Sequence, residues 1–379
     1  MTRQRIVFLD YVRVFACFLV VLVHASENFY GSPNPGEMAG PVSWLCNESD
    51  RLWVSLYDGF SRMSVPLFII VSAYLLAPMK ETDTMWSFYK KRFLRILPPF
   101  LIFMVVYCVL PFFMGQLDAE TALHDFLYIP LNFPSLAGHM WFLYPLISIY
   151  LFIPIISPWL RKATAAEERF FILLFALSTC MPFLRRWFGP VWGECFWNEY
   201  HMLWYFAGYL GYLVTAHYIR VHLTWNNSKR IAVGLPLMIA GAAVTILSFY
   251  VQATPQVELV TPELEIGWCF CTLNVYALTT GAFLLFSTIG RTDDGETAKA
   301  PHKESPLLIS LSRLSFTIYL VHILWLGVWV GIFKYDMEMP TVAAIPVIAV
   351  CTFITSWITA WILSLVPGAK WLGIEPKKH

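Results

Sequence analysis

Charged and imidazole side chains interrupt the first apolar segment of the chain. Residues 9–28 read LDYVRVFACFLVVLVHASEN and include Asp10, Arg13, His24 and Glu27. If this segment crosses a membrane, each charge inside the hydrocarbon costs about 2.5–3.5 kcal/mol even on insertion scales, so these groups are candidates for function. An imidazole beside a carboxylate suits proton transfer, and a guanidinium suits anion binding.

The spacing of these four residues on a helix leaves two interpretations open. Asp10 and Arg13 are three residues apart, so they share a face and can neutralise each other. Arg13 and His24 are separated by nearly three whole turns and point the same way, about 16 Å apart along the axis. Glu27 shares a face with His24 and can fix its tautomer and raise its basicity. Either these are structural pairs that aid helix packing, or they line a shaft with a base near its outer mouth.

A second polar stripe lies in SFTIYLVH, residues 315–322. Ser315, Tyr319 and His322 fall at i, i+4 and i+7, on one face of an apolar helix. Such a face needs partners or a cavity in a bilayer. Hydrogen bonding between neighbouring helices explains it as well as catalysis does.

A pair of arginines stands at the start of another apolar run, KKRFLRILPPF, residues 90–100. Arg92 and Arg95 lie at i and i+3 and face the side predicted to be cytoplasmic. Two adjacent guanidiniums suit a phosphate-bearing ligand. Ordinary anchoring by basic residues at the membrane edge is the alternative.

The remaining polar groups gather at the outer mouths of predicted spans, on the opposite side. Their convergence on His24 would make a site there, but sequence does not show convergence. These residues are Arg62, His139, Glu199 and His201.

The sequence contains none of several common motifs for metal binding, nucleotide binding or hydrolysis. No HExxH or H-x3-H spacing occurs, so we expect no metal site, and His217 and His222 are interpreted as loop residues without a role. No GxGxxG, P-loop or GxSxG is present, which argues against nucleotide-hydrolysing pumps and serine hydrolases of the α/β type.

The composition indicates the elements that must position these residues. Of 379 residues, 58% are hydrophobic and only 13% are charged, about half the charged share of soluble domains. The 26 Lys and Arg residues balance 25 Asp and Glu residues, so no net basic field would attract a nucleic acid. We therefore expect an all-α membrane protein with about ten transmembrane helices, each of about 20 residues. The predicted spans are 7–26, 55–77, 96–114, 141–160, 169–184, 200–216, 231–251, 267–289, 311–333 and 341–366.

The distribution of basic residues predicts that both termini are cytoplasmic. Most Lys and Arg residues lie in the tails and in the loops on the N-terminal side, as the positive-inside rule requires of cytoplasmic segments. An even number of spans gives the same result independently. The opposite side holds Arg51, Arg62, Arg185, Arg186 and Lys334. Cys46 and Cys195 fall in loops on that side and can pair as a disulfide.

Five segments, in this order, resemble the acyltransferase 3 family of integral membrane acyltransferases. RVFACFLVVLVH matches its Arg-x10-His pattern in helix 1, and SRMSVPLFIIVSAYLL is similar to its helix 2 signature, with Ala73 where a Gly is common. RFLRI resembles its Arg-x-x-Arg motif, and HMWFLYPLISIYLFIPII and SFTIYLVH are similar to its helix 4 and helix 9 segments. The resemblance runs from residue 8 to about 365. The likeness is closest to stand-alone members that O-acetylate bacterial surface polysaccharides, and we expect the chain to depart from the longer members that carry a fused SGNH-type esterase domain.

The resemblance implies an acyl-CoA donor used from the cytoplasm and a glycan hydroxyl acylated on the outer side. Arg13, Arg92 and Arg95 would then contact the donor, with Asp10 holding Arg13. His24 would be the catalytic imidazole, either as a general base or as a transient acyl carrier. Glu27 as its orienting partner is inferred from spacing. The passage and the acceptor mouth would be lined by Ser315, Tyr319 and His322, and by His139 and Arg62, respectively.

We therefore expect one acyltransferase 3-like domain over residues 1–379, with residues 367–379 as a cytoplasmic tail, in a bacterial cytoplasmic (inner) membrane. The expected partners are acetyl-CoA as co-substrate, a carbohydrate acceptor that includes lipid-linked forms, and the lipid bilayer, with no nucleic acid and no metal. The sequence leaves open whether the transferred group is acetyl, succinyl or another short acyl group, and it leaves the oligomeric state open. The alternatives are a proton-coupled small-molecule transporter and a non-enzymatic partner in glycan export or assembly.

Overall fold

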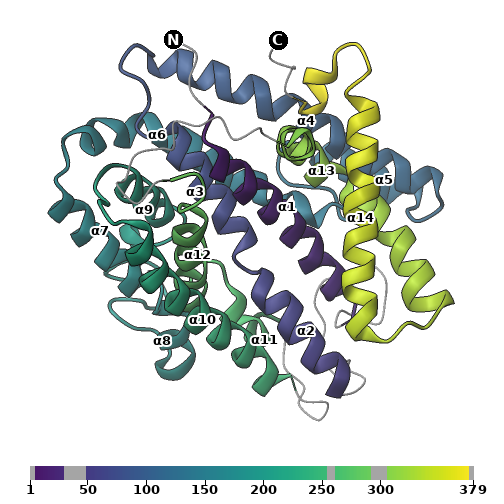
Figure 1. The fold of residues 1–379 in the computed structure, drawn as a ribbon. Helices are drawn as coiled ribbons and strands as arrows, with labels where there is room; N and C mark the ends of the chain where they lie inside the picture. Colours follow the sequence, from purple (N-terminus) through teal and green to yellow (C-terminus); the bar gives the residue numbers. More distant parts are fainter. Residues whose placement is uncertain (1–4, 30–47, 254–260, 292–304, 375–379) are drawn as a thin grey trace.

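A bundle of helices makes up the protein in a computed structural model, which describes residues 5–29, 48–253, 261–291 and 305–374. No strand occurs among these residues, so the predicted all-α class is confirmed (Figure 1). The longer helices are α1 (Val7–Glu27), α2 (Glu48–Ser61), α3 (Ser64–Leu76), α4 (Met85–Phe113), α5 (Ala119–Tyr128), α6 (Leu143–Lys162), α7 (Ala165–Ser178), α8 (Met181–Phe188), α9 (Leu210–Val221), α10 (Asn227–Gln252), α12 (Leu273–Phe286), α13 (Pro306–Val330) and α14 (Thr341–Leu363). The shorter turns are η1 (Gly138–Phe142), η2 (Trp204–Phe206), α11 (Thr261–Leu264), η3 (Ile266–Trp268), η4 (Gly331–Asp336) and η5 (Ala369–Leu372).

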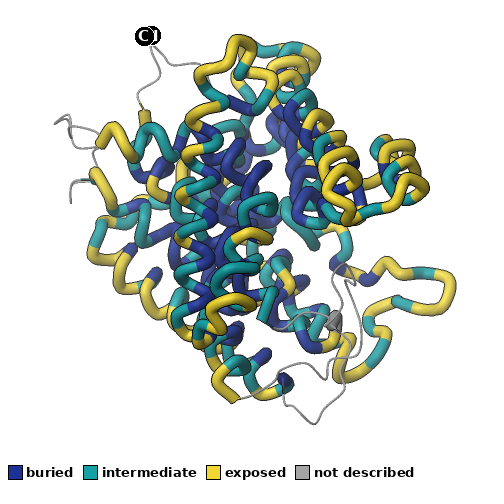
Figure 2. Tube along the Cα trace, turned by 90° about the vertical axis from the view of Figure 1, so that its right-hand side faces the viewer, coloured by how far each residue is buried: buried dark blue, intermediate teal, exposed yellow. Residues whose placement is uncertain are grey.

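Nine helical segments of the described residues are long and apolar enough to cross a membrane. Each overlaps one of the ten predicted spans, and α2 with α3 forms one of the nine. Large apolar side chains cover their outward faces, for example Ile155, Leu173 and Ile239, which are 54–61% exposed. The buried residues fill the middle of the bundle (Figure 2). Apolar surface of this extent is stable against lipid, and the chain is a multi-pass membrane protein.

The predicted span at residues 200–216 is wrong as a continuous helix. Its apolar residues divide between the short turn η2 and α9, which has only 12 residues. At about 1.5 Å per residue, α9 covers roughly 18 Å of a hydrocarbon core of about 30 Å. Gly208 separates the two pieces with φ +79°, a left-handed conformation that ends helical geometry and that glycine adopts without steric cost.

The chain nevertheless returns through the bundle here, because His217 of α9 contacts Glu168 at the start of α7. The start of α1 and η5 lie at one end of the bundle, in agreement with an even number of passages (Figure 1). We call this the inner end. The distribution of basic residues predicts that this end faces the cytoplasm, and the opposite end is called the outer end.

The second predicted span is interrupted in the middle, which places an arginine inside the bundle. α2 ends at Ser61 and α3 begins at Ser64, so Arg62 lies at the break. Pro66 has no backbone N–H, and its ring clashes with the carbonyl four residues earlier, that of Arg62. The proline therefore opens the helix where Arg62 turns inward, and the residue is only 5% exposed.

Glycines allow α10 and α12 to approach closely. A Cβ on Gly241 would lie 2.4 Å from the Leu278 nitrogen, and one on Gly281 would lie 2.5 Å from the Gly234 carbonyl oxygen. Small residues drive helix association in membranes because backbones gain close packing there. α2 packs against α10 of this pair, where Gly59 approaches Ile246.

Candidate active site

Three histidines from distant parts of the sequence meet inside the bundle. His24 of α1 stacks on His322 of α13 with ring centroids 5.3 Å apart, and the ring of His139 of η1 lies 5.1 Å from His322 and 6.5 Å from His24. His322 is fully buried and His139 is 5% exposed, whereas the His24 side chain keeps 19%. We call these three residues the imidazole cluster. His24 is its most accessible member.

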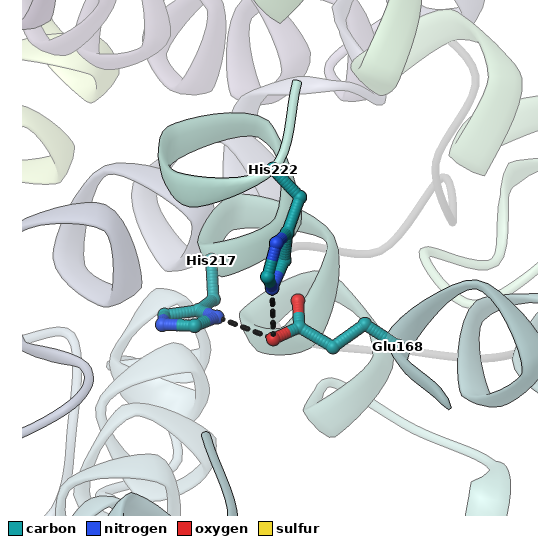
Figure 3. Close-up of side chains that lie close together, drawn as sticks. All are labelled: Glu168, His217 and His222. Carbon is teal, nitrogen blue, oxygen red and sulfur yellow. Dashed lines mark hydrogen bonds and ion pairs between the residues drawn. The ribbon is translucent and has the colours of Figure 1, made fainter. Parts of the chain in front are cut away.

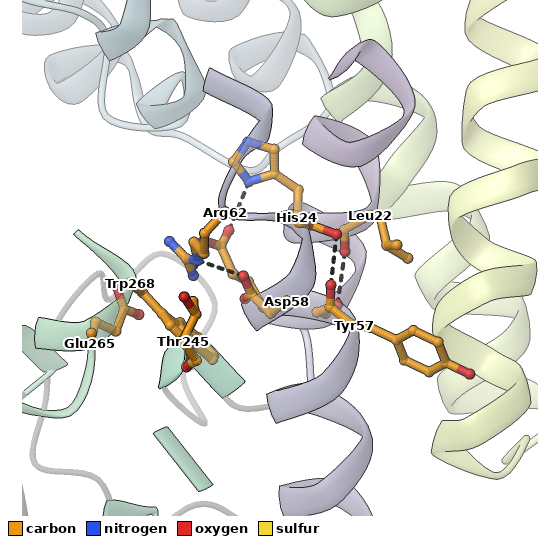
Figure 4. Close-up of polar contacts among 12 residues, drawn as sticks. Leu22, His24, Tyr57, Asp58, Arg62, Thr245, Glu265 and Trp268 are labelled. Atoms are coloured by element: carbon orange, nitrogen blue, oxygen red, sulfur yellow. Dashed lines mark hydrogen bonds and ion pairs between the residues drawn. The ribbon is translucent and has the colours of Figure 1, made fainter. Parts of the chain in front are cut away.

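The side chain of His24 is held by a carboxylate. His24 Nδ1 lies 2.7 Å from Glu27 Oε2, as the i, i+3 spacing predicts (Figure 4). An Nδ1–H that donates to Glu27 leaves Nε2 as the basic nitrogen. Glu27 Oε1 is in turn 3.8 Å from Arg62 Nη2, and Arg62 Nε is 2.6 Å from Asp58 Oδ1. His24, Glu27, Arg62 and Asp58 thus form one chain of charges, which we call the ion chain.

An aromatic wall supports the arginine of the ion chain. The guanidinium of Arg62 lies over the ring of Trp268, 4.3 Å from its centroid. Trp268 donates from Nε1 to the Thr245 carbonyl at 3.0 Å and stacks on Phe249 with centroids 3.8 Å apart. Sequence reasoning missed both Asp58 and Trp268. Asp58 precedes Arg62 by one helical turn, so its i, i+4 spacing could have indicated the pair. Trp268 lies 206 positions after Arg62, and no local pattern indicates that contact.

The polar stripe of α13 faces the same interior. The hydroxyl of Tyr319 donates to the backbone carbonyl of His139, and His322 Nδ1 lies 2.6 Å from the carbonyl of Tyr319. His322 Nε2 is buried without a hydrogen-bond partner among the described residues. Tyr107 of α4 donates to the Leu320 carbonyl at 2.9 Å and supports the stripe from behind. The predicted face is therefore confirmed as inward, and it presents one unused imidazole nitrogen.

A cavity of about 340 Å³ enters the bundle from the inner end. Its walls include the three predicted arginines, Arg13, Arg92 and Arg95, and a fourth, Arg313, which sequence reasoning left without a role. We call it the arginine cavity. Ser315, Tyr319, Phe142, Tyr150 and Ser312 also line it. The cavity is thus cationic at the mouth and lined by hydroxyl and aromatic groups further in.

Tyr319 connects the arginine cavity to the imidazole cluster. It lines the cavity, and its ring lies 5.9 Å from the rings of both His139 and His322. One layer of side chains therefore separates the cationic cavity from the three imidazoles. Arg13 and His24, nearly three helical turns apart on α1, lie on the two sides of that layer.

Asp10 is held more tightly than the sequence suggested. Arg5 Nε donates to its Oδ2 at 2.6 Å and Ser312 Oγ donates to its Oδ1 at 2.5 Å, whereas Arg13 Nη1 is 3.8 Å away. The predicted Asp10–Arg13 pair is present but loose. Asp10 ties α1 to α13, and this fixes the helix from which Arg13 projects.

A second cavity of about 310 Å³ adjoins the first and shares Leu75, Leu76 and Arg92 with it. Its other basic residues are Lys80, Arg161 and Arg220. Asp83 also lines it, and a hydrogen bond from Lys91 holds the pKa of this carboxyl below its usual value. The inner end thus offers two adjoining cationic cavities for one extended anionic ligand.

Not every polar residue at the predicted outer mouths converges on His24. Arg62 and His139 do, although His139 is buried inside the bundle rather than at an open mouth. The backbone N–H of Leu203 donates to His201 Nδ1 at 3.2 Å, and the His201 ring packs on Trp204 within the same loop. Glu199 lies in that loop too, so these two do not join the site. The predicted Cys46–Cys195 disulfide lies outside the described residues, because Cys46 is not among them.

The two regions suit different chemistry. Guanidiniums around a cavity neutralise phosphates through charge-assisted hydrogen bonds. A partly accessible imidazole oriented by a carboxylate is the arrangement of a general base. Against this stands the structural interpretation that the imidazoles and ion pairs only hold helices together. The unpartnered Nε2 of buried His322 is not explained by packing alone, because burying an unsatisfied polar atom costs about 1–3 kcal/mol.

Comparison with protein-family models gives a match. A family model for an acyltransferase domain, that of acyltransferase 3, covers residues 6–361, which include every residue of the imidazole cluster, the ion chain and the four arginines. Searches of curated proteins and of solved structures gave no significant match.

Proposed function

Because the chain belongs to the acyltransferase 3 family, we propose that it is a membrane O-acyltransferase that moves an acetyl group from acetyl-CoA at the inner end to a glycan hydroxyl at the outer end. The family model and the nine apolar helices support a membrane acyltransferase. The observation that carries the finer proposal is the position of Tyr319, which joins the arginine cavity to the imidazole cluster.

The donor enters the two cavities at the inner end. Its phosphates are neutralised by Arg92, which lines both cavities, and by the arginines around it. The less polar arm that carries the thioester extends along Ser315 toward Tyr319. Coenzyme A combines several phosphates with a long uncharged arm. The arginines of the two cavities suit the phosphates, and the hydroxyl and aromatic groups further in suit the arm.

His24 acts as the general base on the acceptor. Its Nε2 takes the proton of the glycan hydroxyl, whose oxygen forms a C–O bond to the thioester carbonyl carbon, and the C–S bond then breaks. The departing thiolate takes the proton from the imidazolium, so the products are the O-acyl ester and free CoA thiol. Glu27 holds the tautomer, and the ion chain through Arg62 to Asp58 stabilises the charge of Glu27. These side chains supply each proton transfer, and we propose that the transfer needs no metal.

The same proposal specifies the membrane and the acceptor. The bilayer is a bacterial cytoplasmic membrane, and the acceptor is a surface or periplasmic carbohydrate, including lipid-linked forms. Carbohydrate reaches the imidazole cluster from the side of Arg62 and Glu27. A proton-coupled transporter would also hold charges within spans, but the cationic pair of cavities favours a polyphosphate donor.

The test is release of free CoA thiol by the purified protein in detergent, with acetyl-CoA or succinyl-CoA and with glycan fragments as acceptor. Wild type should release thiol with one donor preferred, and His24→Ala should not. His124→Ala is the matched control, because His124 has a 70% exposed side chain on α5, outside the site. Unchanged release in His24→Ala would contradict the proposed base. Uptake of a small molecule into vesicles without thiol release would favour the transporter instead.

A further inference from the structure

A second cluster of titratable side chains lies at the inner end, apart from the proposed active site (Figure 3). It joins Glu168 near the start of α7 to His217 of α9 and His222 just after α9. His217 Nδ1 and His222 Nε2 both approach Glu168 Oε1, at 2.7 and 3.2 Å. One possible metal-ligand atom from each of the three residues lies within 4.8 Å of the other two, which makes them a candidate metal-binding group among the residues that the structure describes.

The burial of this cluster requires an explanation. Glu168 is fully buried and the His217 side chain is 2% exposed. Glu168 Oε1 faces both imidazoles, while Oε2 is buried without a hydrogen-bond partner among the described residues. A buried carboxylate is costly unless its charge is compensated and its oxygens are satisfied. The two imidazoles therefore leave half of the carboxylate unused.

We propose that Glu168, His217 and His222 bind a divalent metal ion of the zinc type. Two imidazoles and one carboxylate are a recurrent zinc donor set, with metal–ligand distances of about 2.0–2.2 Å. Ligand atoms at tetrahedral angles then lie roughly 3.3–3.5 Å apart. The contacts of the two imidazoles with Glu168 Oε1, at 2.7 and 3.2 Å, are shorter than this, so the side chains need to separate by less than about 1 Å to admit the ion.

The remaining features of the cluster fit an ion. Glu168 Oε2 supplies a further ligand atom when the carboxylate binds through both oxygens. The His222 side chain is 19% exposed, which leaves a route for the ion and room for a water at an open coordination position. Sequence reasoning missed this group, because the HExxH and H-x3-H spacings place histidines four residues apart, whereas His217 and His222 are five apart and Glu168 lies 49 residues before His217.

A metal here would hold α9 in place against α7. α9 is too short to cross the membrane, so its position depends on side chains that tie it to its neighbours. Between the two histidines, Arg220 reaches the backbone carbonyls of Tyr74 and Ala77 at 2.8 and 3.2 Å and lines the second cationic cavity. The ion joins α7 to α9 and thereby places Arg220 at that cavity.

Cobalt substitution tests the site without reference to activity. Protein carrying no polyhistidine tag is stripped with a chelator and titrated with Co²⁺, whose visible absorption reports tetrahedral coordination, and then with Zn²⁺ in competition. We expect one equivalent of Co²⁺ with such a spectrum, displaced by Zn²⁺. Glu168→Gln and His217→Ala should weaken binding at least tenfold, and His124→Ala should leave it unchanged.

Further controls keep the result decisive. If the buried substitutions impair folding, His222→Ala tests the site, because its side chain is partly exposed and its contact is the longer one. Zn²⁺ should raise the midpoint of thermal unfolding of wild type but not of His222→Ala. The proposal is overturned if no Co²⁺ spectrum develops, or if His24→Ala, in the imidazole cluster, abolishes the spectrum while Glu168→Gln retains it. Loss of thiol release in His24→Ala with metal binding intact separates this proposal from the proposed function.

Discussion

The arginine cavity and the imidazole cluster lie on opposite sides of Tyr319 and are built in opposite ways. The cavity places four guanidiniums around an open space, and Arg13 keeps 29% of its side chain exposed. The cluster packs its imidazoles ring against ring, and each carboxylate near it has a defined partner. Charged side chains at a solvated opening attract anionic ligands of many shapes. Charged side chains in the low-dielectric interior act on a neighbouring group only when the two are held in a fixed geometry. The first region is therefore expected to govern binding and the second to govern the rate.

The largest effect is expected from His24→Ala. Loss of a general base lowers kcat by about 10²–10⁴-fold, while the affinity for acetyl-CoA should stay within twofold because the arginine cavity is untouched. Thiol release measures the first quantity, and equilibrium binding of acetyl-CoA measures the second. A variant that loses donor binding together with activity would show that the two regions are not separate.

A smaller loss is expected from Glu27→Gln. The charged hydrogen bond to His24 at 2.7 Å is replaced by a neutral one, and bonds of this kind contribute about 1.5–3 kcal/mol. We expect kcat to fall about 10–100-fold, with a shift in the pH profile of kcat that a purely structural role would not produce. Glu48→Gln is the matched control, because Glu48 pairs with Arg51 at the far end of α2. An unchanged pH profile would leave Glu27 only a packing role.

The arginine cavity is tested by Arg92→Ala. Its loss should raise KM for acetyl-CoA about tenfold with kcat nearly unchanged, because the other arginines of the cavity keep part of the attraction. Lys90→Ala on the same helix is the control, since Lys90 is exposed and does not line either cavity. Steady-state kinetics separate KM from kcat. A drop in kcat with constant KM would reverse the assignment of the two regions.

The smallest effect is expected from salt. Raising ionic strength from about 0.1 M to about 1 M shortens the screening length from about 10 to about 3 Å. KM for acetyl-CoA should rise a few-fold and kcat should change little, because His139 and His322 are buried and the Glu27 charge acts on His24 at only 2.7 Å, well within the screening length. A kcat that falls with salt as steeply as KM rises would show that the cluster is hydrated.

The fold class and the inward faces of α1 and α13 could be predicted because they depend on local periodicity. The His24–Glu27 pair was predicted for the same reason, since two residues that are three positions apart on a helix lie on the same face and within reach of each other. The span at residues 200–216 was wrong, because apolar composition does not reveal where Gly208 ends a helix. Arg313 was left unassigned since a span edge looks the same whether it faces lipid or a cavity.

The sequence by itself determined which residues are too polar for a bilayer and which helical face each occupies. Its resemblance to acyltransferase 3 also identified the family. The tertiary structure alone decided which faces meet: His139 with His24 and His322, Trp268 under Arg62, and Glu168 with the two histidines of α9. The physical reason is that helix periodicity is set within a few residues, whereas these contacts depend on how helices cross. Crossing is set by close packing at sites such as Gly241 and Gly281, which no local pattern specifies.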